Sequence, residues 1–117
     1  MIKFTVAIDS GILAEDQLRQ LSSKLNIRQA SPETELEEIP AHFYLTHNLH
    51  KVVKLIKTSC LGVFYVGKED DLKKTALSDV ERAGIVVIED VHEVSNVVID
   101  IIQELLGIMF MKNDDDF

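Results

Sequence analysis

The hydrophobic pattern of the chain alternates between short apolar runs and longer stretches in which apolar residues recur every three or four positions. An apolar run without polar alternation is typical of a strand covered on both faces of a parallel sheet. The clearest run, 61–66, leads directly into a polar loop with several acidic residues. The pattern predicts five strands, at 2–8, 25–30, 41–45, 61–66 and 85–88.

The intervening stretches have the spacing of amphipathic helices, each with one apolar face. Ser31 followed by Pro32 predicts a short helix that ends before Pro40. A longer helix is predicted to be capped by Asp70 or Asp71 and closed by Gly84 in a left-handed conformation. The remaining helices are predicted to begin near residues 14, 49 and 93, and the last of them to end near residue 111.

Strands and helices that alternate five times, with short connections, indicate right-handed βα units. The predicted fold class is therefore α/β: a three-layer sandwich with a five-stranded, mostly parallel sheet, flavodoxin-like or Rossmann-like. The order 2-1-3-4-5 is the commonest five-stranded solution, but no residue pattern in the sequence fixes the strand order. Residues 1–111 are expected to form one domain and 112–117 an acidic, disordered tail. The predicted core comprises Val6, Ile8, Leu18, Leu21, Leu45, Val53, Val63, Phe64, Val66, Val80, Val86, Val87 and Val98.

Charge and composition narrow the classes of partner. The chain has 117 residues with 20 acidic and 12 basic side chains, a net charge of -8, which disfavours nucleic acids and anionic membranes. Its one cysteine, Cys60, cannot form an internal disulfide, which fits the reducing cytoplasm. No apolar stretch reaches the roughly 20 residues of a membrane span. We therefore expect a cytoplasmic protein that binds neither membranes nor nucleic acids.

Polar residues follow several predicted strands, and the carboxyl ends of parallel strands share one edge of a sheet. A magnesium ion would need only one or two carboxylates from such a cluster, the rest of its shell being water. Acidic residues are equally favoured at helix starts, where they cap the helix and oppose its dipole. The catalytic candidates are Asp9, Thr46, Asp70, Asp71 and Asp90. The metal candidates are Asp9, Asp71 and Asp90, with magnesium the one cofactor considered.

The segment 63–72, a strand followed by glycine and acidic residues, resembles the last acidic motif of haloacid-dehalogenase-like phosphatases. The resemblance implies Asp9 as the nucleophile and Thr46 as the residue of the threonine motif. Two positions depart from the family pattern: Lys68 stands where the motif has its first aspartate, and Gly11 stands where a general acid is expected.

The first half of the chain is similar in layout to PIN-like nucleases, with Asp9 closing one strand and 43–48 forming another strand and its loop. That family has an acidic residue where Asn48 lies. The resemblance implies a metal-dependent nuclease, which the negative net charge disfavours.

Two histidines, His47 and His50, are three residues apart near a predicted helix start, a spacing that suits a metal pair. Zinc sites require three or four protein ligands, and no third ligand lies nearby in the sequence, because Cys60 follows at the far end of the next helix. A solvated pair of histidines is the alternative interpretation.

The last predicted helix is apolar nearly all round, which is typical of a helix that is buried on two sides or meets a partner. Burial of its end over the chain's own core is the other interpretation. Self-association through its outer side, as a homodimer, is the favoured explanation. The interface candidates are Ile99, Leu106, Met109 and Phe110.

Two functional hypotheses follow from these patterns. The first is a non-enzymatic interaction or regulatory module that binds a protein partner or a second copy of itself through the last helix. The alternative is a magnesium-dependent phosphoryl-transfer enzyme built on Asp9 and the other acidic residues of the edge. The sequence does not decide whether the chain is an enzyme.

Overall fold

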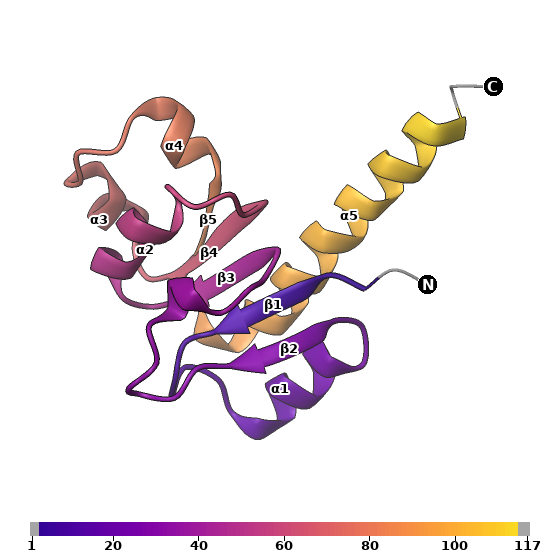
Figure 1. Cartoon of the computed structure of the whole chain (residues 1–117), viewed down its shortest axis with the longest axis horizontal. Helices are drawn as coiled ribbons and strands as arrows, with labels where there is room; N and C mark the ends of the chain where they lie inside the picture. Colours follow the sequence, from indigo (N-terminus) through magenta and orange to yellow (C-terminus); the bar gives the residue numbers. More distant parts are fainter. Residues whose placement is uncertain (1–2, 115–117) are drawn as a thin grey trace.

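The computed structural model describes the backbone of residues 3–114 and the side chains of residues 3–108. A five-stranded sheet lies at its centre, with every neighbouring pair of strands parallel (Figure 1). The strand order β2-β1-β3-β4-β5 confirms the predicted doubly wound arrangement. The strands are β1 (Thr5–Ile8), β2 (Asn26–Gln29), β3 (Phe43–Thr46), β4 (Gly62–Val66) and β5 (Ile85–Ile88).

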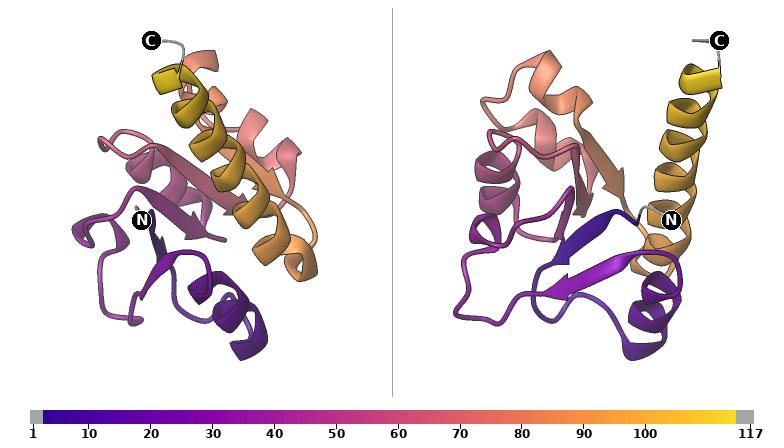
Figure 2. Two further views of the ribbon diagram at one scale, coloured as in Figure 1. Left: turned by 90° about the vertical axis from the view of Figure 1, so that its right-hand side faces the viewer. Right: turned by 45° about the vertical axis from the view of Figure 1, so that its right-hand side comes forward.

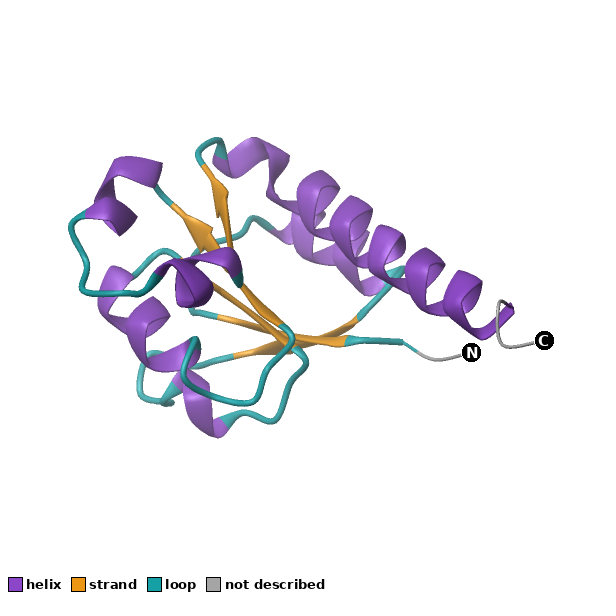
Figure 3. Ribbon diagram, turned by 90° about the horizontal axis from the view of Figure 1, so that it is seen from above, coloured by secondary structure: helices purple, strands orange, loops and turns teal. Residues whose placement is uncertain are grey.

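Helices cover both faces of the sheet and make it the middle of three layers (Figures 2 and 3). The helices α1 (Glu15–Ser22) and α5 (Val94–Asp114) pack on one face, and α2 (Leu49–Leu55), α3 (Glu69–Lys73) and α4 (Asp79–Ala83) lie on the other. Two 3₁₀ turns complete the chain: η1 (Leu36–Glu38) and η2 (Val91–Glu93).

Two apolar clusters, one on each face, hold the layers together. Phe64 of β4 and Leu45 of β3 belong to the α1/α5 cluster, while Val63 and Tyr44 belong to the opposite one. The split follows the strand period of two, which turns successive side chains to opposite faces. The central strand β3 is buried at all four of its positions, as expected for a strand covered on both faces.

The predicted helix over about 70–83 is wrong, because two short helices replace it. Ser78 caps α4 by accepting a hydrogen bond from the Glu81 amide, while the Glu81 carboxylate accepts one from the Ser78 amide. This capping box restarts the helix and changes its phase. Val80, predicted to be in the core, is therefore 84% exposed. The helix α3 begins at Glu69 with Lys68 at the N-cap position, so neither Asp70 nor Asp71 caps it.

The predicted helix at Ser31 is also wrong. Ser31 and Thr34 form a turn in which their hydroxyls bond to each other and the Thr34 amide donates to the Ser31 carbonyl. Only the 3₁₀ turn η1 follows, with Leu36 buried. Serine hydroxyls compete with helix formation by bonding locally, and here the local bond wins.

Two glycines lie in close contact with side chains, and neither has a left-handed backbone. Gly84 closes α4 with φ at -87°, so the predicted left-handed cap is wrong. A Cβ at Gly84 would lie 2.9 Å from the Ile56 side chain, and one at Gly67 would lie 2.4 Å from the ring of Tyr65. Both loops thus lie flat against apolar side chains, where no larger residue fits without a shift.

The last helix, α5, continues to Asp114 and not to residue 111 as predicted. Its 21 residues span about 31 Å at 1.5 Å per residue, so it outruns the short strands and extends past the sheet (Figure 1). Ile99 and Leu106, two interface candidates, are half-buried and pack against the α1/α5 cluster. The side chains of Met109 and Phe110 lie outside the described residues.

Within the described part of the chain, no helix combines the length and the apolar character needed to cross a membrane.

Candidate functional site

Asp9 and Thr46 meet where β1 and β3 end. The connection from β1 leads to β2 on one side, whereas β3 and the later strands extend the sheet on the other. Such a switch in direction opens a crevice at the carboxyl edge, where ligands of open α/β sheets bind. The Asp9 amide donates to the Leu45 carbonyl at 2.9 Å, which continues the ladder between the two strands and fixes Asp9 beside Thr46.

The Asp9 carboxylate is buried, with 4% of the residue exposed, and it has a partner at each oxygen. Its Oδ2 accepts a hydrogen bond from the Thr46 hydroxyl at 2.8 Å. Its Oδ1 accepts from the Lys51 ammonium at 2.8 Å and from the Ser10 amide at 3.0 Å. We call these three side chains, Asp9, Thr46 and Lys51, the Asp9 cluster.

Lys51 reaches Asp9 because Asn48 fixes the start of α2. The Asn48 side chain accepts from the amides of His50 at 3.0 Å and Lys51 at 3.4 Å, an N-cap. The Asn48 amide in turn donates to the Thr46 hydroxyl oxygen at 3.1 Å. The cap thus places Lys51 in the first turn of the helix, with its ammonium directed back to the end of β1.

The Asp9 cluster holds a charge in a buried place. Burial raises the pKa of Asp9, but the hydrogen bonds from Lys51, Thr46 and Ser10, with the positive charge of Lys51, outweigh it and leave that pKa below the ordinary 3.8. Asp9 is therefore ionised at neutral pH. The Lys51 side chain keeps 29% of its surface exposed, so the ion pair borders solvent on one side.

The other acidic candidates have partners of their own. Asp71 accepts a hydrogen bond from the Tyr65 hydroxyl at 3.2 Å, and burial together with the Asp71 charge raises the pKa of Tyr65. Asp70 pairs with Lys73 at 3.6 Å on the exposed surface of α3. Asp90 caps η2 by accepting from the His92 amide at 2.9 Å. These contacts are local, and none of the three carboxylates forms a hydrogen bond or an ion pair with a described residue of the Asp9 cluster.

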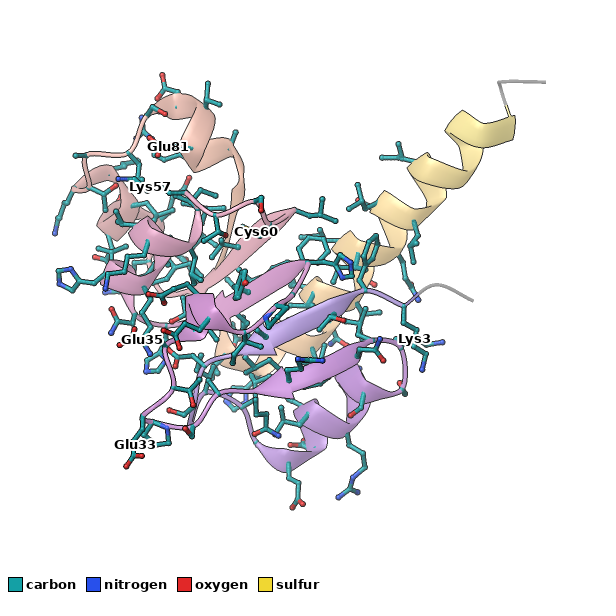
Figure 4. All side chains as sticks on the ribbon, in the orientation of Figure 1. Lys3, Glu33, Glu35, Lys57, Cys60 and Glu81 are labelled. Carbon is teal, nitrogen blue, oxygen red and sulfur yellow. The ribbon has the colours of Figure 1, made fainter. Side chains whose placement is uncertain are left out.

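Among the described residues, no group of three or more histidine, cysteine, aspartate or glutamate side chains is placed to hold a metal ion. His47 and His50 are exposed. Cys60 is a free, half-buried thiol next to the amino end of β4, away from the carboxyl edge (Figure 4). That Asp9, Asp71 and Asp90 bind a metal ion stays a prediction. Among the described residues, their carboxylate oxygens are not grouped around a common point where an ion could bind.

Sequence reasoning identified Asp9 and Thr46 but missed Lys51. The available signal was its position. Thr46 closes β3, Asn48 caps the next helix, and Lys51 lies one turn after that cap, so its side chain points back to the sheet edge. Chemically, the Asp9 cluster is an ion pair of Asp9 with Lys51, supported by the Thr46 hydroxyl, and each carboxylate oxygen of Asp9 accepts from at least one internal donor. Such a pair fixes the relative position of β1, β3 and α2.

A second candidate site is an apolar hollow of about 260 Å³ between α5 and the amino ends of β4 and β5, which we call the α5 hollow. Leu61 and Ile108 lie at it and are 55% and 61% exposed. Among the lining residues that the structure describes, Glu104 is the one that carries a charge. The other lining residues are Phe43, Gly62, Val63, Phe64, Ala83, Gly84, Val86, Ile101 and Leu105.

Comparison of the chain with family models, with curated proteins and with solved structures finds no match. The fold and the two sites define a doubly wound α/β domain with a clamped carboxylate at the switch point and an apolar hollow beside its last helix.

Proposed function

We propose that the chain is a non-enzymatic interaction or regulatory module of the cytoplasm, and that its working surface is the α5 hollow. The observation that carries the proposal is the exposure of Leu61 and Ile108 at an apolar hollow. Monomeric proteins rarely leave contiguous apolar surface open unless it binds something. The partner is a protein surface that presents apolar side chains, which includes a second copy of this chain.

The state of the Asp9 cluster supports a role outside catalysis. A general base or a nucleophile needs a free lone pair directed at its substrate. Asp9 is 4% exposed, and three internal donors, one of them the fully buried Thr46, take three of the roughly four lone-pair positions of its carboxylate. The cluster therefore acts as a clamp that keeps the sheet edge rigid while binding takes place elsewhere.

Site-specific photo-cross-linking tests this proposal. We expect a photoreactive residue at Ile108 to give a discrete cross-linked product in cells that produce the protein. Val80 is the matched control, because it is an aliphatic residue that is more exposed than Ile108, 84% against 61%, and does not line the hollow. Ile101→Asp should abolish the product at Ile108, since it places a charge in the apolar lining. Equal products at both positions, or none at either, would contradict the proposal.

A magnesium-dependent phosphoryl-transfer enzyme is the second candidate function. The observation in its favour is the contact of Asp9 with both Thr46 and Lys51 at the carboxyl edge, because a hydroxyl and an ammonium can bind a phosphoryl group while a carboxylate serves as nucleophile or metal ligand. That chemistry requires the Lys51 ammonium to leave Asp9 and a metal ion to take its place. The resemblance to haloacid-dehalogenase-like phosphatases implies the same two residues, Asp9 and Thr46.

A further inference from the structure

We propose that the α5 hollow binds a short basic amphipathic helix of another protein, with the apolar side of that helix in the hollow and a lysine or arginine beside Glu104. The inference rests on the proposed function, because both use the same surface. It goes further by naming the chemistry of the partner. If a partner of another kind bound there, the proposed function would stand and this inference would fail.

One wall of the α5 hollow is a stripe along a helix. The residues that line it from α5 have the spacing i, i+3, i+4 and i+7, which places them on one side of that helix: Ile101, Glu104, Leu105 and Ile108. At 1.5 Å per residue the stripe is about 10 Å long, or two turns. Leu61, just before β4, adds a second exposed apolar side chain to the hollow. Such a surface accepts the apolar side of a helix of similar length, a common mode of peptide recognition.

The strands beneath the hollow have backbones that are already paired. The Leu61 amide donates to the His42 carbonyl at 2.7 Å, and the Val63 amide donates to the Gly84 carbonyl at 3.0 Å. Phe64 lies in β4, which has β3 on one side and β5 on the other. An extended segment laid over these residues would leave its own amides and carbonyls unpaired, whereas a helix satisfies its backbone internally. The hollow therefore favours a helix as its occupant.

The charges on α5 beside the hollow are negative. Glu104 lines the hollow and is exposed, and Asp100, also exposed, precedes it by one helical turn. The described side chains of α5 include no lysine or arginine, and none of the ion pairs in the described part of the chain involves either carboxylate. A basic side chain of the partner would thus meet two negative charges at the border of an apolar surface, which is the complementary arrangement.

The other elements around the hollow do not reverse this sign. Arg82 of α4 pairs with Asp79 of the same helix. Lys57, just after α2, lies near Glu81 of α4, so its charge is also matched (Figure 4). These two pairs leave the acidic residues of α5 as the excess charge beside the hollow.

A second copy of this chain fits the surface poorly. Each copy has a net charge of -8, so two copies repel each other. A two-fold pairing through the hollow would also bring Glu104 and Asp100 of both copies to one interface, since the same patch serves both subunits. Like charges that face each other across an interface lower affinity. A basic helix of another protein avoids both penalties.

Fluorescence anisotropy with a labelled synthetic peptide tests the inference. The probe is a helix of about four turns made of leucine and lysine, with the leucines spaced to share one face. At about 0.15 M salt, which limits non-specific attraction to this acidic chain, wild type should bind the probe with a Kd of about 1–100 µM. A control peptide with a central proline, which breaks the helix, should bind about tenfold more weakly.

Two pairs of matched variants separate the charge from the apolar contact. Glu104→Lys should weaken binding about tenfold, whereas Glu33→Lys, the same change after β2 at the opposite end of the sheet, should alter it less than about twofold (Figure 4). Ile108→Ser should weaken binding about fivefold, whereas Val80→Ser should leave it unchanged. A peptide with glutamate in place of lysine should bind Glu104→Lys more tightly than wild type. All four positions are exposed, and circular dichroism checks that each variant folds.

Several results would overturn the basic helix as the partner. Among them are no binding by wild type below about 1 mM, equal binding of the proline peptide, and equal affinities of Glu104→Lys and Glu33→Lys. A photo-cross-linked product at Ile108 that Glu104→Lys leaves unchanged, or one with the mass of two copies of this chain, would overturn it as well. Either of these last two results would leave the α5 hollow as the working surface, so the two proposals can fail separately.

Discussion

Phe64→Ala is expected to lower the free energy of unfolding by about 3–5 kcal/mol, the range for an aromatic side chain removed from a packed core. Phe64 is 1% exposed and sits in β4, one strand from the edge of the sheet. Its ring lies 5.7 Å from that of Phe43, centre to centre, within the α1/α5 cluster. Its removal enlarges the space already present as the α5 hollow, because Phe64 lines that hollow.

Chemical denaturation with urea measures this loss, provided that the slope with denaturant stays unchanged. Leu61→Ala is the matched control on the approach to the same strand. Since Leu61 is 55% exposed, its truncation should cost less than about 0.5 kcal/mol. A loss below about 1 kcal/mol for Phe64→Ala would contradict the position of β4 at the centre of the core.

The second large effect is expected at the Asp9 cluster: Asp9→Asn should cost about 1.5–3 kcal/mol at pH 7, the range for hydrogen bonds to a charged group. The change removes the charge that Lys51 neutralises and leaves an amide facing two donors, Lys51 and Thr46. Part of the cost is recovered because the half-exposed Lys51 side chain can turn to solvent.

The loss caused by Asp9→Asn should depend on pH. The pKa of Asp9 is lower in the folded chain than the ordinary 3.8. The ionised Asp9 therefore stabilises the fold fully above about pH 3.8, and this stabilisation disappears as the pH falls through the folded-state pKa. Unfolding curves of wild type and variant at several pH values should therefore converge in acid. Asp70→Asn, on an exposed pair, should change stability by less than about 0.5 kcal/mol. A loss at Asp9→Asn that is equal at pH 7 and at pH 2 would contradict the ion pair.

The strands and the parallel sheet could be predicted from the sequence because each strand is a short apolar run and each βα connection has one favoured hand. The order β2-β1-β3-β4-β5 could only be taken as the commonest arrangement, since no residue pattern fixes which strands are neighbours. The helices were less predictable. Ser31 and Ser78 look alike as helix starts, yet Ser78 has Glu81 to complete a capping box, whereas Ser31 has Thr34 at the same distance and forms a turn. Val80 shows the consequence, since a shift in helix start moves an apolar residue from the core to the surface.

The candidate site was half predictable. Asp9 and Thr46 follow apolar strands, and neighbouring parallel strands bring such residues together. Lys51 was missed, although its position one turn after the Asn48 cap was a signal, because its contact with Asp9 depends on how that cap aims the first turn of α2. Similarly, the apolar run of β5 suggested a strand buried from both faces, but its position at the edge depends on the strand order and not on its composition.

A manganese titration followed by calorimetry tests the central claim most directly, namely that the Asp9 cluster is a structural clamp and not a catalytic centre. Manganese prefers the same oxygen ligands as magnesium. The account predicts no heat of binding below millimolar concentrations, in wild type and in Asp9→Asn alike. Micromolar binding by wild type that Asp9→Asn abolishes would contradict the account and establish the carboxyl edge as a metal site.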